Sequence, residues 1–189
     1  MINTRTRIPR SGNAALAAGA LIQAALGLEF LFAGLNKAVN PNYVQQFSGY
    51  VQGMPGSNSG PLAAIIQTLV VPHLELAAQL AKFTELGAGA VLLVTAMEVA
   101  RRRFSGPFGA EHAYEPLVAL LSAAAALAVA GLSATIYLIQ GGRLPTIDPS
   151  FGFSPPISVE LLVVPLALGV AWLEFGRFRA LRPPHMRAH

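Results

Sequence analysis

The sequence contains no cysteine among its 189 residues. This absence excludes disulfides, thiolate zinc sites, iron–sulfur ligation and a protein persulfide intermediate. Charged residues are also scarce, at 12% of the chain, whereas a soluble domain usually has about a quarter. Hydrophobic residues make up 53%. This composition predicts an integral membrane protein whose first partner is the lipid bilayer.

Recognisable cofactor and metal motifs are missing as well. The sequence has no zinc-ligand spacing, no Gly-rich phosphate loop and no dinucleotide fingerprint. Four histidines are present, but we expect no two of them at one depth on facing helices, as a bis-histidine membrane haem requires; they are His73, His112, His185 and His189. We therefore expect no cofactor held covalently or by a recognisable motif, so another subunit would supply any redox cofactor.

Four segments are long and apolar enough to cross a membrane. A bilayer core of about 30 Å takes roughly 20 helical residues. The four predicted spans are about residues 14–36, 79–99, 116–140 and 157–176. The predicted fold class is therefore all-α, a four-helix integral membrane bundle that forms one membrane domain over residues 1–189.

The basic residues predict the orientation of this bundle. Ten arginines fall on one side of the four-span arrangement: Arg5, Arg7, Arg10, Arg101, Arg102, Arg103, Arg177, Arg179, Arg182 and Arg187. Only Lys37, Lys82 and Arg143 fall at or near the other side. Because cytoplasmic loops are rich in Lys and Arg, we expect a multi-pass protein of the cell's inner (plasma) membrane with both termini in the cytoplasm. The net charge of +4 then reflects topology and implies no nucleic-acid partner.

The connection between the first two spans, residues 37–78, is expected on the outer side. Its apolar stretch PLAAIIQTLVVPH, residues 61–73, is too short to cross, and Pro72 is expected to break it from the second span. We interpret residues 61–73 as an interfacial or re-entrant helical segment. A helix that caps the bundle is preferred over a functional lid.

Polar and small residues separate onto two faces of the first span. Glu29, Asn36 and Lys37 follow the spacing i, i+7, i+8 and share one helical face. Gly27 and Gly34 lie on the opposite face, where small residues allow close helix approach. The first span is therefore expected to have one polar face and one tightly packed face.

Charged residues in the second span extend the polar face of the first. Lys82 and Glu85 are three residues apart, and counting about 1.5 Å per residue from the flanking arginines places Glu85 and Glu29 at similar depth in the outer half. We predict one cluster of Glu29, Lys37, Lys82 and Glu85, because intramembrane charges usually face inward and pair. Two interpretations stay open: a site for a quinone head, a proton or an anion, and a structural ion pair that fixes the register between the two helices. Lys82 and Glu85 can also satisfy each other locally, because they share a face of one helix.

Glutamates nearer the ends of the spans are expected at the membrane interface. Glu98 has Arg101 and Arg102 at i+3 and i+4 and is expected to form a snorkelling pair. Glu160 and Glu174, near the two ends of the fourth span, are expected to be interfacial too.

Two stretches carry a family resemblance. LGLEFLFAGLNKAVNP, residues 26–41, and AKFTELGAGAVLLV, residues 81–94, resemble the DoxX/DoxD family of small four-helix membrane proteins. A first helix there ends in Gly-x-x-Lys, and a second carries Glu followed by glycines. The matching residues here are Gly34, Lys37, Glu85, Gly87 and Gly89. The resemblance covers roughly residues 14–103.

The resemblance implies a membrane subunit of a quinone-linked oxidoreductase, because the family includes the small subunit of a thiosulfate:quinone oxidoreductase. Such a chain would carry no redox cofactor of its own and would have quinone as its candidate ligand. The candidate catalytic residues are Glu85, Glu29, Lys37 and Lys82. The candidate substrate-binding residues are Lys37, Asn36 and Arg143.

An alternative function is a non-catalytic accessory subunit of a larger respiratory or photosynthetic complex, so whether the chain is an enzyme stays open. The missing cofactor ligands and the abundant Ala and Gly, which suit helix packing, favour this alternative. Other subunits of a membrane complex are the partners that both functions imply. A transporter or channel is less favoured, because the sequence has no repeat signature and no pair of broken spans.

Overall fold

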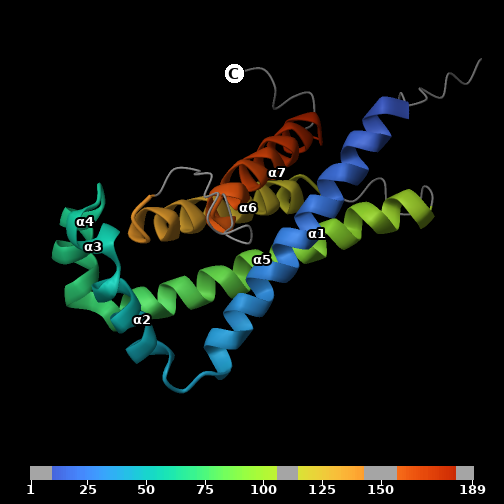
Figure 1. Cartoon of the computed structure of the whole chain (residues 1–189). Coiled ribbons are helices and arrows are strands. Elements are labelled where there is room, and N and C mark those ends of the chain that lie inside the picture. The colour runs from blue at the N-terminus through green and yellow to red at the C-terminus, as the bar shows by residue number, and fades with distance from the viewer. Residues whose placement is uncertain (1–9, 106–114, 143–156, 182–189) are drawn as a thin grey trace, which may run out of the picture.

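The computed structural model describes residues 10–105, 115–142 and 157–181. The burial and contacts of side chains are described for residues 17–100, 116–142 and 157–181. All secondary structure in these ranges is helical (Figure 1). Its elements are α1 (Arg10–Val39), α2 (Tyr43–Gly53), α3 (Pro55–Ser59), α4 (Ala63–Ile65), the π-helical turn η1 (Ile66–Val70), the 3₁₀ turn η2 (Val71–His73), α5 (Leu74–Ser105), α6 (Glu115–Ile139) and α7 (Val159–Leu181).

Four of these helical stretches are long and apolar enough to cross a membrane. They are Ala17–Val39, Ala63–Ala100, Pro116–Ile139 and Val159–Leu181. Large apolar side chains such as Leu21, Phe83, Leu127 and Trp172 are exposed on their outer faces. Lipid surrounds such faces readily, whereas water does not. Over the described residues, the structure therefore confirms an all-helical fold with four helices of spanning length, as expected for a multi-pass membrane protein.

Glycines allow a close contact between the long helices α1 and α5. A Cβ atom at Gly89 would lie 2.4 Å from the backbone nitrogen of Leu31, and one at Gly34 would lie 2.8 Å from that of Leu86. Gly27 meets the α5 backbone in the same way, so the two helices run antiparallel with their backbones nearly touching (Figure 1). The tight face predicted at Gly27 and Gly34 is confirmed.

The four long helices share one apolar core. Leu26 and Phe30 of α1, Leu92 of α5, Val129 of α6 and Val170 of α7 are buried against one another. Alanines fill most of the remaining buried positions, and small residues let membrane helices approach closely. In Figure 1 the α6 and α7 helices lie side by side as a second pair next to the crossing α1 and α5.

The connection from α2 to η2 packs on one end of the bundle, which we call the α2 end; α1 ends there and α5 begins there. Val51 of α2, Ile66 of η1 and Ile139 of α6 form a small buried cluster. A Cβ atom at Gly56 would lie 1.9 Å from the carbonyl oxygen of Leu138, so α3 rests directly on the end of α6. The connection is therefore a folded cap rather than a free loop.

Helical conformation continues through Pro72, where the sequence predicts a break. Residues 63–73 pass from α through π to 3₁₀ geometry and run directly into α5. Pro72 lies in the first residues of the 3₁₀ turn, where its missing N–H donor matters least. The predicted break is wrong: the proline changes the type of helix and does not end it.

Candidate functional site

The Lys37 ammonium group forms an ion pair with the Glu85 carboxylate at the α2 end of the α1–α5 contact. Glu85 is 3% exposed, and the Lys37 side chain is 28% exposed. Lys37 lies in the last turn of α1, where a cation also interacts favourably with the helix dipole. Gly34 and Gly89 bring the two helices close enough for Lys37 to reach across. Two of the predicted site residues therefore meet.

Tyr43 of α2 lies beside this ion pair. Its buried hydroxyl donates a hydrogen bond of 3.1 Å to the carbonyl oxygen of Ala78 in α5. Burial, together with the negative charge of Glu85, raises the pKa of Tyr43 to about 12. The side chain is therefore a neutral phenol at physiological pH. The sequence pattern did not place Tyr43 in the site, because its position depends on how α2 folds back against α5.

Lys82 does not join the cluster as predicted. Its ammonium nitrogen lies 5.1 Å from the centre of the Phe83 ring, and it forms no ion pair within the part of the chain that the structure describes. Glu85 is instead satisfied from the neighbouring helix by Lys37. The local pairing of Lys82 with Glu85 does not form, because the helix contact brings a closer cation, and the ion pair of Glu85 lies between two helices.

Glu29 is exposed and is not part of the ion pair. Gly34 packs against Leu86, and Lys37 pairs with Glu85, so Glu85 lies level with the end of α1. Glu29 is eight residues before Lys37, which is roughly 12 Å along α1. The glycine contacts set the register between the helices, so Glu29 and Glu85 are offset along the bundle, and their depth in a membrane stays a prediction. The charge of Glu29 still repels that of Glu85.

The two predicted substrate-binding residues other than Lys37 are not part of the pair. Asn36 is exposed on α1. Arg143 lies outside the described residues. Neither residue therefore adds a contact to the ion pair in the described structure.

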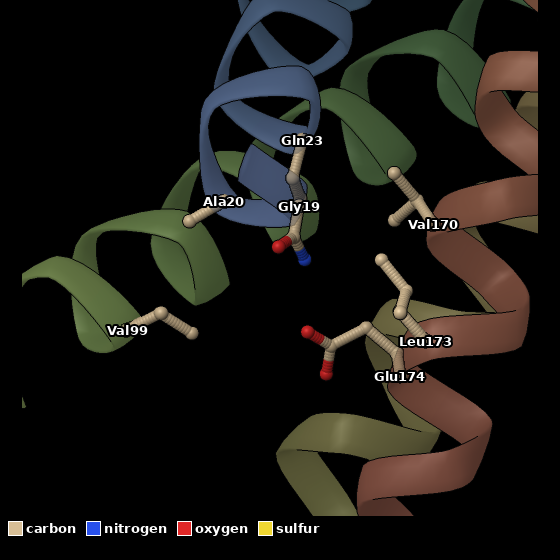
Figure 2. A pocket seen from close by; sticks show the side chains of 7 residues that line it. All are labelled: Gly19, Ala20, Gln23, Val99, Val170, Leu173 and Glu174. Atoms are coloured by element: carbon tan, nitrogen blue, oxygen red, sulfur yellow. The ribbon is translucent and has the colours of Figure 1, made fainter. Parts of the chain in front are cut away.

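A second polar site lies between α1, α5 and α7, farther from the α2 end (Figure 2). It is a small hollow with room for about one water molecule. Its lining residues are Gly19, Ala20, Gln23, Val99, Val170, Leu173 and Glu174.

Glu174 and Gln23 supply the polar groups of this hollow. Glu174 is 5% exposed and points into the hollow (Figure 2), and Arg177 pairs with its carboxylate at 3.1 Å. The side-chain amide of Gln23 donates a hydrogen bond to the Ser122 hydroxyl of α6. The side chain of Glu174 is buried between helices, and its expected position at the membrane interface stays a prediction. A helical pattern could have revealed this face of α7, since its buried residues are Ala167, Val170, Ala171, Glu174 and Phe178.

The chemistry available at the two sites differs. The Lys37–Glu85 pair combines a cation that can attract an anion with a carboxylate that can exchange a proton, close to one end of the bundle. The Glu174 hollow has room for only about one water molecule. Arg177 is already paired with its carboxylate, and Gln23 lines the same hollow. Within the described ranges, no group of three or more His, Asp or Glu side chains is placed to hold a metal ion. The Lys37–Glu85 pair is therefore the stronger candidate for a functional site.

Comparisons of the chain with protein-family models, with curated proteins and with solved structures give no match. The resemblance to the DoxX/DoxD family therefore stays a prediction from the two sequence stretches.

Proposed function

We propose that the chain is a DoxX/DoxD-like membrane subunit of a quinone-linked oxidoreductase of the thiosulfate:quinone type. The observation that supports this function is the ion pair between Lys37 and Glu85. These residues belong to the two separate stretches that carry the resemblance, and the fold brings them together at one end of the bundle. Intramembrane ionisable groups mark functional sites more often than chance would give.

In this proposal each residue of the site has one role. Lys37, with Arg143, attracts the anionic substrate. Glu85 exchanges a proton with the head of the quinone, whose reduction takes up protons as well as electrons. Tyr43 stays protonated and is a hydrogen-bond donor next to Glu85. The electrons come from a cofactor on another subunit. Glu29 and Lys82 do not belong to the ion pair, and the proposal gives them no part in this site.

The proposal includes an orientation in the plasma membrane. We place the α2 end at the outer face and both termini in the cytoplasm, because Arg10 at the start of α1 and Arg101, Arg102 and Arg103 near the end of α5 lie toward the opposite end. Residues 63–73 would then lie at the outer membrane interface as part of the cap.

The Glu85→Gln variant tests this function. We expect the complex that is purified through this chain to lose thiosulfate-dependent quinone reduction. Glu75→Gln is the matched control, because Glu75 is an exposed carboxylate at the start of the same helix. Unchanged turnover in Glu85→Gln, in a complex with all its subunits, would contradict the proposed site.

A second candidate function is an accessory subunit of a larger respiratory or photosynthetic complex. It is favoured by Glu29, an exposed carboxylate in the middle of a membrane-spanning helix, which a neighbouring subunit could cover. Native mass spectrometry in mild detergent tests this candidate. We expect a complex with other membrane proteins, whereas a lone monomer or a homodimer would exclude it.

A further inference from the structure

Glu29 lies in the middle of the first candidate span. It is 12 residues after Ala17 and 10 residues before Val39, or about 18 and 15 Å along the helix from the two ends. Its side chain is exposed on the surface of the bundle and makes no hydrogen bond or ion pair with the residues that the structure describes. A carboxylate at this depth cannot reach either membrane surface, because its side chain is only a few ångströms long.

An ionisable side chain that faces lipid at this depth is unfavourable by several kcal/mol in most scales. Such residues are rare in spans, and they usually face protein and pair. The same face of α1 carries further residues that the bundle leaves exposed; they are Ala25, Phe32 and Asn36, at i−4, i+3 and i+7 from Glu29. We call these four residues the Glu29 face. Its mixture of a charge, an amide, an aromatic ring and a small residue suits a protein neighbour better than acyl chains.

A second copy of this chain does not supply the missing charge. In a symmetric dimer within a membrane, the same residue lies at the same depth in both copies. Lys37 and Lys82 lie near the α2 end, and Lys37 is already paired with Glu85. Two Glu29 side chains that faced each other would repel.

The arginines of the last span do not supply that charge either. Arg177 and Arg179 follow Glu174, which lies opposite Gly19 and Gln23 of α1, farther from the α2 end than Glu29. Arg177 is also paired already with Glu174. No basic residue of the described chain therefore lies at the depth of Glu29, and charge complementarity points to a different protein.

We propose that the Glu29 face is the docking surface for a transmembrane helix of a different subunit, which presents a lysine or an arginine to Glu29 in the middle of the membrane. This inference rests on the proposal that the chain is a subunit of a membrane complex. A cation at that position would convert an isolated carboxylate into a hydrogen-bonded pair, and removing one partner of such a pair is strongly destabilising. The ion pair would also fix the depth and rotation of the incoming helix.

The test combines photo-crosslinking with charge exchange in the complex purified from native membranes. A photoreactive phenylalanine analogue replaces Phe32 and, as the matched control, Leu127, which is 54% exposed against 60% for Phe32 but lies on α6. We expect position 32, and not position 127, to crosslink to a transmembrane peptide of another protein that contains Lys or Arg. Adducts with lipid alone, with a second copy of this chain, or with a peptide that has no basic residue would overturn the inference.

Charge exchange then tests the pair itself. Glu29→Lys should lower the yield of the crosslinked subunit by at least about tenfold, and changing the identified basic residue to Glu should restore it. Glu29→Gln keeps the size of the side chain and should lower the yield less, which separates loss of pairing from misfolding. Full recovery of the subunit with both Glu29 variants would refute the inference. A chain that purifies without any partner would refute the proposed function as well, whereas a complete complex with lipid adducts at position 32 would refute the docking surface alone.

Discussion

Lys37 of α1 and Glu85 of α5, 48 residues apart in the sequence, form an ion pair across a contact lined by glycines. The pair connects the end of the first membrane helix to the early part of the second. Because removal of one partner leaves a charge without compensation in a buried position, the two residues depend on each other. The pair also keeps two ionisable groups in one place at the α2 end, where we propose that the chemistry occurs.

The first prediction concerns the stability that this pair provides. Lys37→Met and Glu85→Gln, each alone, should lower the free energy of unfolding by roughly 1–3 kcal/mol, less than for a fully buried pair because Lys37 is partly exposed. The exchange of both charges, Lys37→Glu with Glu85→Lys, should recover the wild-type value to within about 1 kcal/mol, since only the helix-dipole interaction is reversed. Denaturant titration in detergent measures these changes. Single variants as stable as the wild type would show that the pair contributes nothing to the fold.

The second prediction concerns the glycines between α1 and α5. Gly89→Ala places a Cβ atom 2.4 Å from the backbone nitrogen of Leu31, so the helices must move apart and stability should fall by about 1–3 kcal/mol. Gly87→Ala is the matched control, because nothing lies within 4 Å of a Cβ atom there and alanine favours a helix. Thermal unfolding in detergent should separate the two variants clearly. Equal stability of both would mean that the helices are not in contact at Gly89.

The third prediction concerns the pH dependence from Tyr43. Burial and Glu85 raise the pKa of this phenol from 10.0 to about 12, so the folded state holds its proton more tightly than the unfolded state does. The contribution to stability is complete below pH 10 and is lost as pH rises toward 12. Tyr43→Phe should therefore make stability less dependent on pH in this window, and it should lower stability at neutral pH by about 1 kcal/mol through the lost hydrogen bond to Ala78. Unfolding followed at a series of alkaline pH values measures both effects, and identical pH profiles for the variant and the wild type would contradict the burial of this phenol.

Helix periodicity in the sequence predicts much of the fold but little of the site. Length and apolar composition identified the four spanning helices, and periodicity identified the small-residue face at Gly27 and Gly34, because both depend on residue types within one helix. It also singled out Lys37 and Glu85, but only within a cluster of four residues, so it left open whether Lys37 or Lys82 pairs with Glu85. The partner of Glu85 depends on the rotation and axial shift of α1 against α5, and no single-helix pattern contains that information.

Contacts between elements, which single-helix patterns do not contain, also explain the residues whose positions the sequence did not predict. Glu174 and Gln23 face each other across the hollow only because α7 packs beside α1 (Figure 2). Tyr43 approaches Glu85 because α2 folds back on α5. Pro72 was expected to end a helix, but a 3₁₀ turn accommodates its missing N–H group. Each of these positions is set by contacts between elements rather than by local sequence.

The central claim is that Lys37 and Glu85 form a functional site and not only a structural pair. The most direct test is thiosulfate-dependent quinone reduction by the complex that contains the exchanged pair, Lys37→Glu with Glu85→Lys. This variant keeps an ion pair between the same helices, so we expect it to assemble with its partners. We predict turnover as low as in Glu85→Gln, because the carboxylate and the cation have changed places relative to quinone and anion. Wild-type turnover in the fully assembled variant would contradict this account and leave the pair a structural one.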